Sequence, residues 1–429
     1  MQNLAFDINQ GSDLSDGQLD PERAVPPVPR ISVQAFCESP DIHAAVQDAF
    51  EDRRMSKTTR SAQMGGLAAS VEFYQTSPTP NLIIVESQGS AETIAAGLEK
   101  LAEVCDSGTR VVVIGHLNDV LLYRELIRKG ISEYLVAPIS PLQLVGVVSD
   151  IYASPQSDPV GRVVAFAGAR GGAGSSTIAH NVGWAISTDL ETNVVIADMD
   201  LPFGTAGLDF NQDPVQGLAN AVLENERADE QMIERLLFKC TDRLSLLAAP
   251  ATLEREYDLQ PAAYDTIVDI MRKSVPCTVL DVPHIWSGWA RNALWTADEV
   301  VITASPDLAS LRNTKNIIEL LKAKRKHDNP PRLVLNQVGV AKRPEIAPDD
   351  FAAALEMDPV AIIPFDPQLF GLAANNGQMI AEMGQASKIA ETFSEVAKLV
   401  TGRTGVKRPK GSALSGILNR LKKRKGSGE

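Results

Sequence analysis

Residues 168–177 have the sequence GARGGAGSST, a glycine-rich loop whose composition suits it to hold a phosphate group. Glycine lets the backbone turn so that successive N–H groups face one anion. The loop follows an apolar run at 162–167 and precedes a helical pattern that begins at Thr177, which is the strand–loop–helix order of a P-loop. Its glycines are Gly168, Gly171, Gly172 and Gly174. The sequence therefore predicts that this loop binds the phosphates of a nucleotide.

Ser175 stands where the motif G-x-x-x-x-G-K-[ST] has its lysine. The main-chain donors of the loop remain, but the cation that neutralises the outer phosphate oxygens during phosphoryl transfer is missing. We therefore expect nucleotide binding to be favoured over fast hydrolysis. A glycine cluster is also typical of a flexible turn between a strand and a helix, so the interpretation depends on the motifs downstream.

Two further apolar runs end in acidic residues. Asp198 and Asp200 follow the run at 193–197, and Asp281 lies in the run at 279–283. In a parallel sheet such strand ends lie at the edge where ligands bind, and a carboxylate there can hold Mg²⁺ directly or through water. A single aspartate at a strand end is commonly a helix cap. A glycine loop followed by two such carboxylates is harder to explain by structure alone.

The motifs GARGGAGSST, DMDLPFGTAGLDF and LDVPHIW together resemble the MinD/ParA class of deviant Walker A ATPases. In that family a signature lysine at the start of the loop reaches across a nucleotide-sandwich dimer, and this position falls on Arg170, which keeps a positive charge with forked geometry. The P-loop lysine falls on Ser175 and the Mg²⁺-binding hydroxyl on Ser176. The residue that orients the attacking water falls on Asp200, and the Walker B acid falls on Asp281.

The resemblance also implies contacts to the base. Asn336 falls where the family binds adenine, although an asparagine after a strand is often only a turn former, and 363–366 resembles the segment that flanks the base. We therefore expect ATP and Mg²⁺ as cofactors, with catalysis by Asp200 and Arg170 and metal ligation by Ser176 and Asp281. The expected cofactor-binding residues are Gly171, Gly172, Ala173, Gly174, Ser175, Ser176, Thr177, Asn336, Pro364 and Phe365.

The segment 282–313, VPHIWSGWARNALWTADEVVITASPDLASLRN, narrows the resemblance to the CpaE/TadZ branch, the pilus-assembly ATPase-like proteins of Flp/Tad type IVc pilus systems. The opening ISVQAFCESP and the lysine-poor loop agree with this branch, and the match covers most of 30–400. The P-loop lysine is often replaced in the branch, so membership implies Ser175. We interpret Trp286, Trp289 and Trp295 as core or interface packing.

Composition describes a globular protein of more than one domain. The chain has 429 residues, of which 44% are hydrophobic and 22% charged. No apolar run approaches the roughly 18 residues of a membrane span, and the N-terminus lacks the basic and apolar regions of a signal peptide, so we expect a cytoplasmic protein. The cysteines form no C-x-x-C pair and indicate neither a zinc site nor a disulfide framework. They are Cys37, Cys105, Cys240 and Cys277.

Residues 31–152 show a (βα)₅ rhythm that resembles a response-regulator receiver. Glu86 falls on the phosphoryl-accepting aspartate, Cys37 and Glu38 fall on the paired Mg²⁺ acids, and Ala137 falls on the lysine before Pro138. We therefore expect a pseudo-receiver used for docking or targeting. Extended segments are predicted at 30–36, 69–75, 81–86, 110–115 and 133–136, with helices at 91–105 and 120–129.

Residues 161–400 alternate strands with helices, which predicts a doubly wound parallel sheet of the α/β class. The resemblance implies that this is a MinD/ParA-like P-loop domain. Residues 1–30 are acidic and expected to be disordered, and 153–160 have linker composition. The predicted strands are 162–168, 193–198, 244–248, 277–281, 299–304, 331–336 and 360–364.

The tail 401–429 has nine Lys and Arg and one acid, a net charge of +8, so the remainder carries −21 of the whole-chain charge of −13. A helix over 414–425 would place four apolar residues in one stripe opposite basic residues, which suits an anionic membrane surface or a partner helix. Disorder and nucleic-acid contact are the alternatives. The stripe consists of Leu414, Ile417, Leu418 and Leu421.

Three functions follow as hypotheses. The first is an ATP-binding scaffold, a homodimer that localises and helps assemble the Flp/Tad secretion machinery at the inner membrane or cell pole with weak or no hydrolysis. The second is an active ParA/MinD-type ATPase that cycles between dimer states to position cellular cargo. The third, a signalling protein switched by phosphorylation, is disfavoured by Glu86 and Ala137. No specific nucleic acid is expected, because the body of the chain is acidic.

Overall fold

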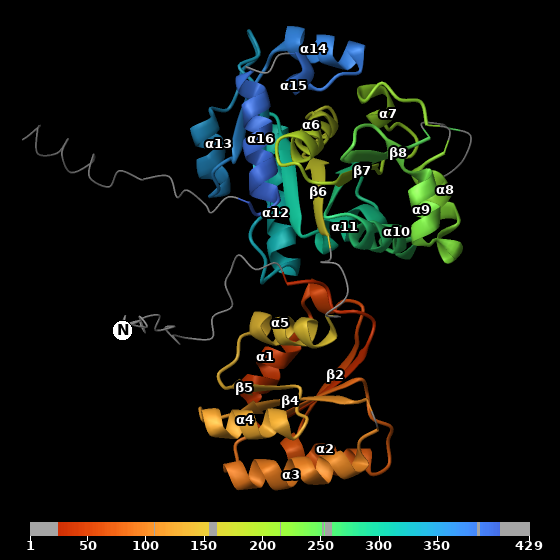
Figure 1. Ribbon diagram of the computed structural model, residues 1–429. Helices are drawn as coiled ribbons and strands as arrows, with labels where there is room; N and C mark the ends of the chain where they lie inside the picture. The colour runs from red at the N-terminus through yellow and green to blue at the C-terminus, as the bar shows by residue number, and fades with distance from the viewer. Residues whose placement is uncertain are drawn as a thin grey trace, which may run out of the picture. The chain divides into compact units, whose positions relative to one another are not determined.

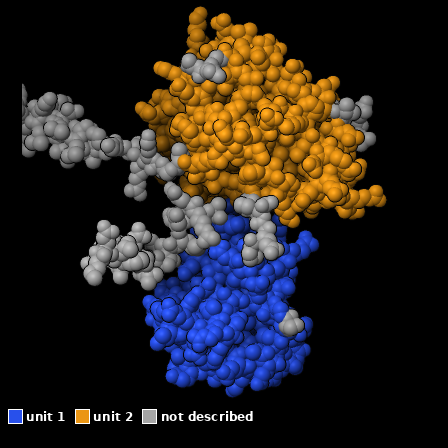
Figure 2. Space-filling view, viewed as in Figure 1, with its two compact units in different colours: residues 1–156 blue, residues 157–429 orange. Residues whose placement is uncertain are grey.

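The computed structural model describes residues 25–106, 108–153, 161–214, 216–250, 253, 260–383 and 387–403. The chain divides into two compact units, unit 1 (Met1–Gln156) and unit 2 (Ser157–Glu429), which Figure 2 distinguishes by colour. Each unit has its own sheet and its own apolar cores. The predicted disorder at 1–24, most of the predicted linker and the tail 414–425 lie outside the described residues.

Unit 1 is a five-stranded parallel sheet in the order β2-β1-β3-β4-β5, with helices on both faces (Figure 1). One apolar core lies under α1 and α5 and the other under α2, α3 and α4. This confirms the receiver-like (βα)₅ fold. The strands are β1 (Ser32–Cys37), β2 (Thr59–Met64), β3 (Leu82–Ser87), β4 (Arg110–Gly115) and β5 (Glu133–Val136). The helices are α1 (Pro40–Phe50), α2 (Gly66–Tyr74), α3 (Ala91–Val104), α4 (Val120–Arg128) and α5 (Pro141–Tyr152).

The strand predicted at 69–75 is wrong, because these residues belong mostly to α2. The alternation of Val71 and Phe73 favoured a strand, but the buried residues Leu67, Ser70 and Tyr74 recur at helical spacing. The true second strand, β2, lies at the sheet edge and most of its side chains reach solvent. An edge strand without an apolar face leaves no alternating pattern in the sequence.

The ordered part of unit 1 begins before residue 31. Val28 is buried and its N–H donates to Arg54 O at 2.8 Å, while Ser149 Oγ donates to Pro26 O at 2.9 Å. The prolines of this segment therefore do not prevent it from packing on α5. Residues 25–30 cover the core that α1 and α5 share.

Unit 2 is an eight-stranded sheet in the order β13-β12-β11-β6-β10-β7-β9-β8, in which β8 runs antiparallel to β9 and the other neighbouring strands are parallel. The doubly wound fold is confirmed, and the seven predicted strands agree with the observed ones to within two residues. The strands are β6 (Arg162–Gly168), β7 (Val194–Asp198), β8 (Phe238–Lys239), β9 (Leu244–Leu247), β10 (Cys277–Val282), β11 (Glu299–Ala304), β12 (Arg332–Val338) and β13 (Ala361–Pro364).

Helices cover both faces of this sheet, with α6 and α16 on one face and α10, α11 and α12 on the other. Several of these helices begin with a capping residue followed by proline. The helix that begins at Pro367 is an example, because Asp366 Oδ1 accepts a hydrogen bond from Leu369 N. The helices are α6 (Ser175–Thr188), α7 (Ala206–Asp209), α8 (Leu218–Leu223), α9 (Glu230–Leu236), α10 (Pro261–Ser274), α11 (Gly288–Thr296), α12 (Leu308–Lys324), α13 (Pro348–Leu355), α14 (Pro367–Asn376), α15 (Ile380–Met383) and α16 (Lys388–Val400).

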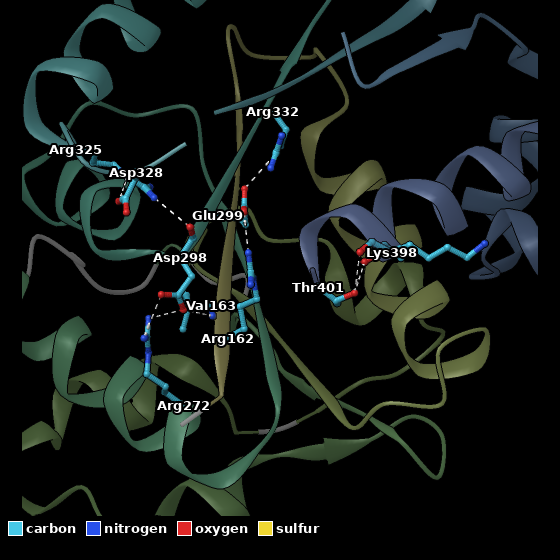
Figure 3. Close-up of polar contacts among 11 residues, drawn as sticks. Arg162, Val163, Arg272, Asp298, Glu299, Arg325, Asp328, Arg332, Lys398 and Thr401 are labelled. Atoms are coloured by element: carbon cyan, nitrogen blue, oxygen red, sulfur yellow. Dashed lines mark hydrogen bonds and ion pairs between the residues drawn. The ribbon is translucent and has the colours of Figure 1, made fainter. Parts of the chain in front are cut away.

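Buried ion pairs join the amino ends of the central strands, at the edge of the sheet opposite the glycine loop (Figure 3). Glu299 accepts from Arg162 at 2.7 Å and from Arg332 at 3.3 Å, and Arg272 lies 3.0 Å from Asp298. These pairs tie β6, β11, β12 and the end of α10 together. Because the charges are largely removed from water, the loss of one partner leaves the others uncompensated.

We expect Glu299→Ala to lower the free energy of unfolding of unit 2 by about 3 kcal/mol, because two partly buried arginines lose the buried carboxylate that they share. Urea denaturation followed by tryptophan fluorescence measures this change, since all four tryptophans lie in unit 2. The control is Glu395→Ala, which removes the exposed pair with Lys398 and should change stability by less than about 0.5 kcal/mol. Equal effects of the two variants would contradict the structural role of this cluster.

Candidate functional site

The glycine loop lies at the carboxyl edge of the sheet of unit 2, between β6 and α6, and forms one wall of a cleft of about 920 Å³. The other walls come from the segments that follow β7 and β10 and from the start of α10. The cleft is lined by Gly168, Arg170, Gly171, Gly172, Ala173, Gly174, Ser175, Ser176, Thr177, Met199, Asp200, Leu201, Pro202, Phe203, Tyr264, Val282, Pro283, His284, Ile285, Ser287 and Trp289. The expected phosphate-binding residues and Asp200 therefore share one cleft.

Two glycines of the loop have backbones that other residues rarely adopt. Gly172 has φ 78° and Gly174, the residue before α6, has φ 88°. A Cβ on Gly174 would lie 2.4 Å from Asn336 Nδ2, whereas positions 171 and 172 have open space above them. No side chain of the described residues caps the N-terminus of α6, which leaves its first N–H groups for a ligand.

Side chains from three neighbouring segments hold the carbonyl groups of the loop. The donors come from β12, from α12 and from the segment after β10. The bonds are Asn336 Nδ2 to Ala173 O (2.9 Å), Gln337 Nε2 to Gly172 O (2.9 Å), Asn313 Nδ2 to Ala169 O (2.9 Å) and His284 Nδ1 to Gly168 O (3.0 Å). Because these carbonyls are bonded within the protein, the loop is shaped in advance and its N–H groups remain for an anion.

Ser175 does not replace the charge of a lysine. Its Oγ is buried, and it has no hydrogen-bond partner among the described residues. The cation that lines the cleft is Arg170, whose Nε lies 3.5 Å from Asp307 Oδ2 within the same chain. Asp307 also caps α12, because its Oδ1 accepts from Ser310 N at 2.8 Å. Arg170 is thus held at the mouth of the loop by the start of α12.

Three aspartates lie at the ends of neighbouring strands, and of these Asp200 lines the cleft whereas Asp198 and Asp281 do not. Asp198 and Asp281 are paired in register on β7 and β10, and both are buried. Burial and the nearby charge of Asp281 raise the pKa of Asp198 to about 7. Asp200 lines the cleft, and burial raises its pKa as well. The donors that the sequence assigns to Mg²⁺, the Ser176 hydroxyl and the carboxylate of Asp281, are oxygens of the kind that Mg²⁺ prefers.

His180 completes this cluster and has no part in the predicted site. It is fully buried on α6, with Nδ1 2.7 Å from Asp209 Oδ2 and Nε2 3.3 Å from Asp281 Oδ2. Although burial alone lowers the pKa of a histidine, bonding to Asp209 and Asp281 raises that of His180 to about 10. A histidine on the apolar face of the helix after the loop was the signal available in the sequence. Gln337, Asn313 and Asp307 gave no comparable signal.

The residues assigned to adenine do not line the cleft. Asn336 is buried below the loop, where its amide supports Ala173. Pro364 ends β13, and the exposed Phe365 donates its N–H to Val338 O at 2.8 Å. The structure gives Asn336 a role in shaping the loop, and its contact with the base stays a prediction.

The three tryptophans of 282–313 have different surroundings. Trp289 is buried at the cleft and stacks on Tyr264, with ring centroids 4.4 Å apart. Trp295 lies against the cations of Arg291 and Lys324. Trp286 is 52% exposed. Of the three tryptophans that we interpreted as packing residues, Trp286 is therefore largely uncovered by the described residues of unit 2.

Unit 1 contains a second polar cluster, at the end of β3. Glu86 is fully buried, and its carboxylate accepts from Glu38 N (2.7 Å), Ser39 N (2.9 Å) and Ser39 Oγ (2.6 Å) and lies 3.0 Å from His116 Nε2. Burial raises the pKa of Glu86, but the bonds from Ser39, His116 and Glu38 outweigh it and lower the pKa below 4.5. The donors at the start of α1 are therefore taken by the chain's own carboxylate. The pseudo-receiver function stays a prediction.

No helix in the part of the chain that the structure describes is long and apolar enough to cross a membrane. In the same residues, no group of three or more histidine, cysteine, aspartate and glutamate side chains is arranged to hold a metal ion.

Known proteins resemble this chain in sequence and in fold. A family model described as an AAA domain matches residues 161–333. The septum site-determining protein MinD of Synechocystis sp. is 24% identical over 271 residues, which cover 61% of this chain and 98% of that protein. The pilus assembly protein CpaE from Caulobacter crescentus CB15 is 46% identical, covers 30% of this chain and 98% of its own, and has a TM-score of 0.30. A ParA family ATPase from Chlorobium tepidum TLS is 24% identical over 55% of this chain and 98% of its own, with a TM-score of 0.51, and agrees in fold.

We expect Glu86→Gln to destabilise unit 1 at neutral pH, because an amide cannot accept from all of its present donors. The lowered pKa gives the direction of the pH dependence: the charged carboxylate stabilises above pH 4.5, and this contribution is lost as the pH falls through the lower pKa of the folded state. The two proteins should therefore converge in acid. Hydrogen exchange of β3 between pH 3 and 7 tests this, with exposed Glu72→Gln as the control.

Proposed function

This chain belongs to the CpaE branch of the MinD/ParA family, and from this premise we propose that it is an ATP-binding scaffold for pilus assembly. The observation that carries the proposal is the loop between β6 and α6, which is held in an anion-binding shape while Ser175 replaces the catalytic lysine. Such a loop binds phosphate through its main chain. It lacks the cation that would stabilise the transferring phosphoryl group, so binding serves assembly more than turnover.

In this proposal, different residues of the chain bind the phosphates, hold the loop in shape and hold the metal ion. The N–H groups of the loop and of the first turn of α6 bind the phosphates, and Asn336 and Asn313 keep the loop in position. Ser176 and Asp281 would hold Mg²⁺, which neutralises phosphate oxygens when bound. Asp200 and Arg170 line the cleft, where Asp200 would orient water and Arg170 would supply a cation at the mouth. The base contacts from Asn336, Pro364 and Phe365 belong to the same proposal.

A second copy of this chain is the partner that the surface around the cleft favours. Exposed apolar side chains occur in the segments after β7, β10 and β11, and the first two of them line the cleft: Phe203 (66% exposed), Ile285 (47%), Trp286 (52%) and Leu308 (73%). Apolar groups gathered around a charged ligand site are typical of an interaction surface. We infer that ATP brings two such faces together and that Arg170 then exchanges Asp307 for phosphate oxygens.

The dimer would act in the cytoplasm and contact the Tad/Flp secretion components at the inner membrane or cell pole. Two basic tails in one dimer would bind an anionic surface more tightly than one. The relative from Caulobacter crescentus is a pilus assembly protein, which supports a role in assembly.

A true ATPase cycle is the second candidate function, because Arg170 and Asp200 line the same cleft as the loop. The guanidinium of Arg170 could take over the charge of the missing lysine. Both proposals require ATP binding. They differ in the rate of phosphate release.

We expect Gly174→Val to weaken ATP binding by on the order of 100-fold, because a side chain there meets Asn336 and opposes the positive φ of residue 174. Isothermal titration with ATP measures the change. The control is Gly371→Ala on α14, where an added Cβ meets nothing within 4 Å. Unchanged affinity of Gly174→Val would show that the loop is not the nucleotide site.

We expect the unaltered protein to form dimers with ATP while it releases little phosphate. Ser175→Lys should raise phosphate release by on the order of 10-fold or more, because it restores the charge that acts in the transition state. Light scattering and phosphate release on the same samples measure both quantities, with Ser175→Ala as the control. Rapid release by the unaltered protein, lost in Asp200→Ala, would favour the ATPase cycle instead.

A further inference from the structure

The segment 200–210 lies between the end of β7 and the end of α7, and it carries two of the exposed apolar side chains of unit 2, Phe203 and Leu208. Asp198 anchors it from below. Asp198 Oδ1 accepts from Asp200 N and Oδ2 from Ala206 N, both at 3.1 Å. The backbone of residue 204 passes so near that a Cβ there would lie 2.3 Å from Asp198 Oδ2.

His180 provides a second anchor from the helix that follows the phosphate loop. Its Nδ1 bonds Asp209 Oδ2 at 2.7 Å. Its ring packs on Phe210, which also stacks on Trp184, with centroids 5.7 and 6.5 Å apart. The end of the segment is therefore held to α6 by one buried polar bond and by ring packing.

Both anchors meet at Asp281. His180 Nε2 lies 3.3 Å from Asp281 Oδ2, and Asp198 is the residue paired with Asp281 on the adjacent strand. These groups are buried, so each has few partners to exchange. A change in the position of the Asp281 carboxylate therefore changes its contact with His180, which holds the end of 200–210.

We propose that His180 is a positioning residue that links Asp281 to the segment 200–210, so that occupation of the nucleotide and cation site is transmitted to Phe203 and Leu208. The part of this inference that concerns the nucleotide rests on the proposed function. The contacts of His180 with Asp209 and Asp281 do not depend on that proposal. A histidine that served only in packing would need neither the contact with Asp209 nor the contact with Asp281.

Three substitutions separate the two polar contacts of His180, the hydrogen bond of Nδ1 with Asp209 and the ion-pair contact of Nε2 with Asp281. His180→Asn keeps a donor near the position of Nδ1, toward Asp209, and loses the contact with Asp281. His180→Gln keeps a donor near the position of Nε2, toward Asp281, and loses the tether of α7. His180→Phe keeps a ring against Phe210 and loses both polar contacts. Tryptophan fluorescence establishes which variants keep unit 2 folded.

The first test uses hydrogen exchange of 200–210 in the full chain without nucleotide. We expect His180→Gln and His180→Phe to raise the exchange rate of the amides at the end of α7 by roughly tenfold, and His180→Asn to leave it near the original rate. Asp281→Asn should change the exchange of 200–210 when His180 is present and have a much smaller effect in the His180→Asn background. Additive effects of the two substitutions would overturn the inference.

The second test adds ATP and Mg²⁺. In the unaltered protein we expect the exchange of 200–210 to change on binding, and in His180→Asn we expect ATP to bind without that change. An unaltered response in His180→Phe would show that the histidine only packs. Failure of the unaltered protein to bind ATP would refute the proposed function, while the comparison without nucleotide would still decide whether His180 links Asp281 to the segment.

Discussion

The carbonyl groups of the glycine loop are bonded to side chains from β12, from α12 and from the segment after β10, and the site depends on this constraint. A peptide group whose C=O is bonded inside the protein offers its N–H outward. The sheet order makes the arrangement possible, because β10 and β11 flank β6 and β12 lies next to β11. Chain segments more than a hundred residues away in the sequence therefore shape a glycine-rich loop.

Each unit has a parallel sheet of its own, and the two units differ in what occupies the carboxyl edge of that sheet. In unit 1, Glu86 fills the position at the start of α1 where donors converge, and its charge is balanced by hydrogen bonds within the protein. In unit 2, the donors at the start of α6 have no such internal acceptor among the described residues. A closed anion site favours one conformation, whereas an open one allows a ligand to change the protein around it.

The sequence predicted the strands of unit 2 well, because strands buried on both faces are continuous apolar runs between turn residues. It also predicted the loop and the strand-end aspartates, since glycine and acidic residues at such places have specific uses. It failed at β2, whose polar side chains face solvent at the sheet edge. It also gave no sign of the bonds from Asn313 and Gln337 to the loop or of His180 between Asp209 and Asp281, because such pairs form only after distant elements pack.

The absence of lysine from 168–177 has a consequence for control of the protein. Acetylation can cancel the charge of a P-loop lysine and so silence a nucleotide site in one step. Main-chain amides cannot be acetylated, and they do not titrate in the physiological range. Lysine acetylation therefore has no target within 168–177, whereas it has one in a P-loop that carries the lysine.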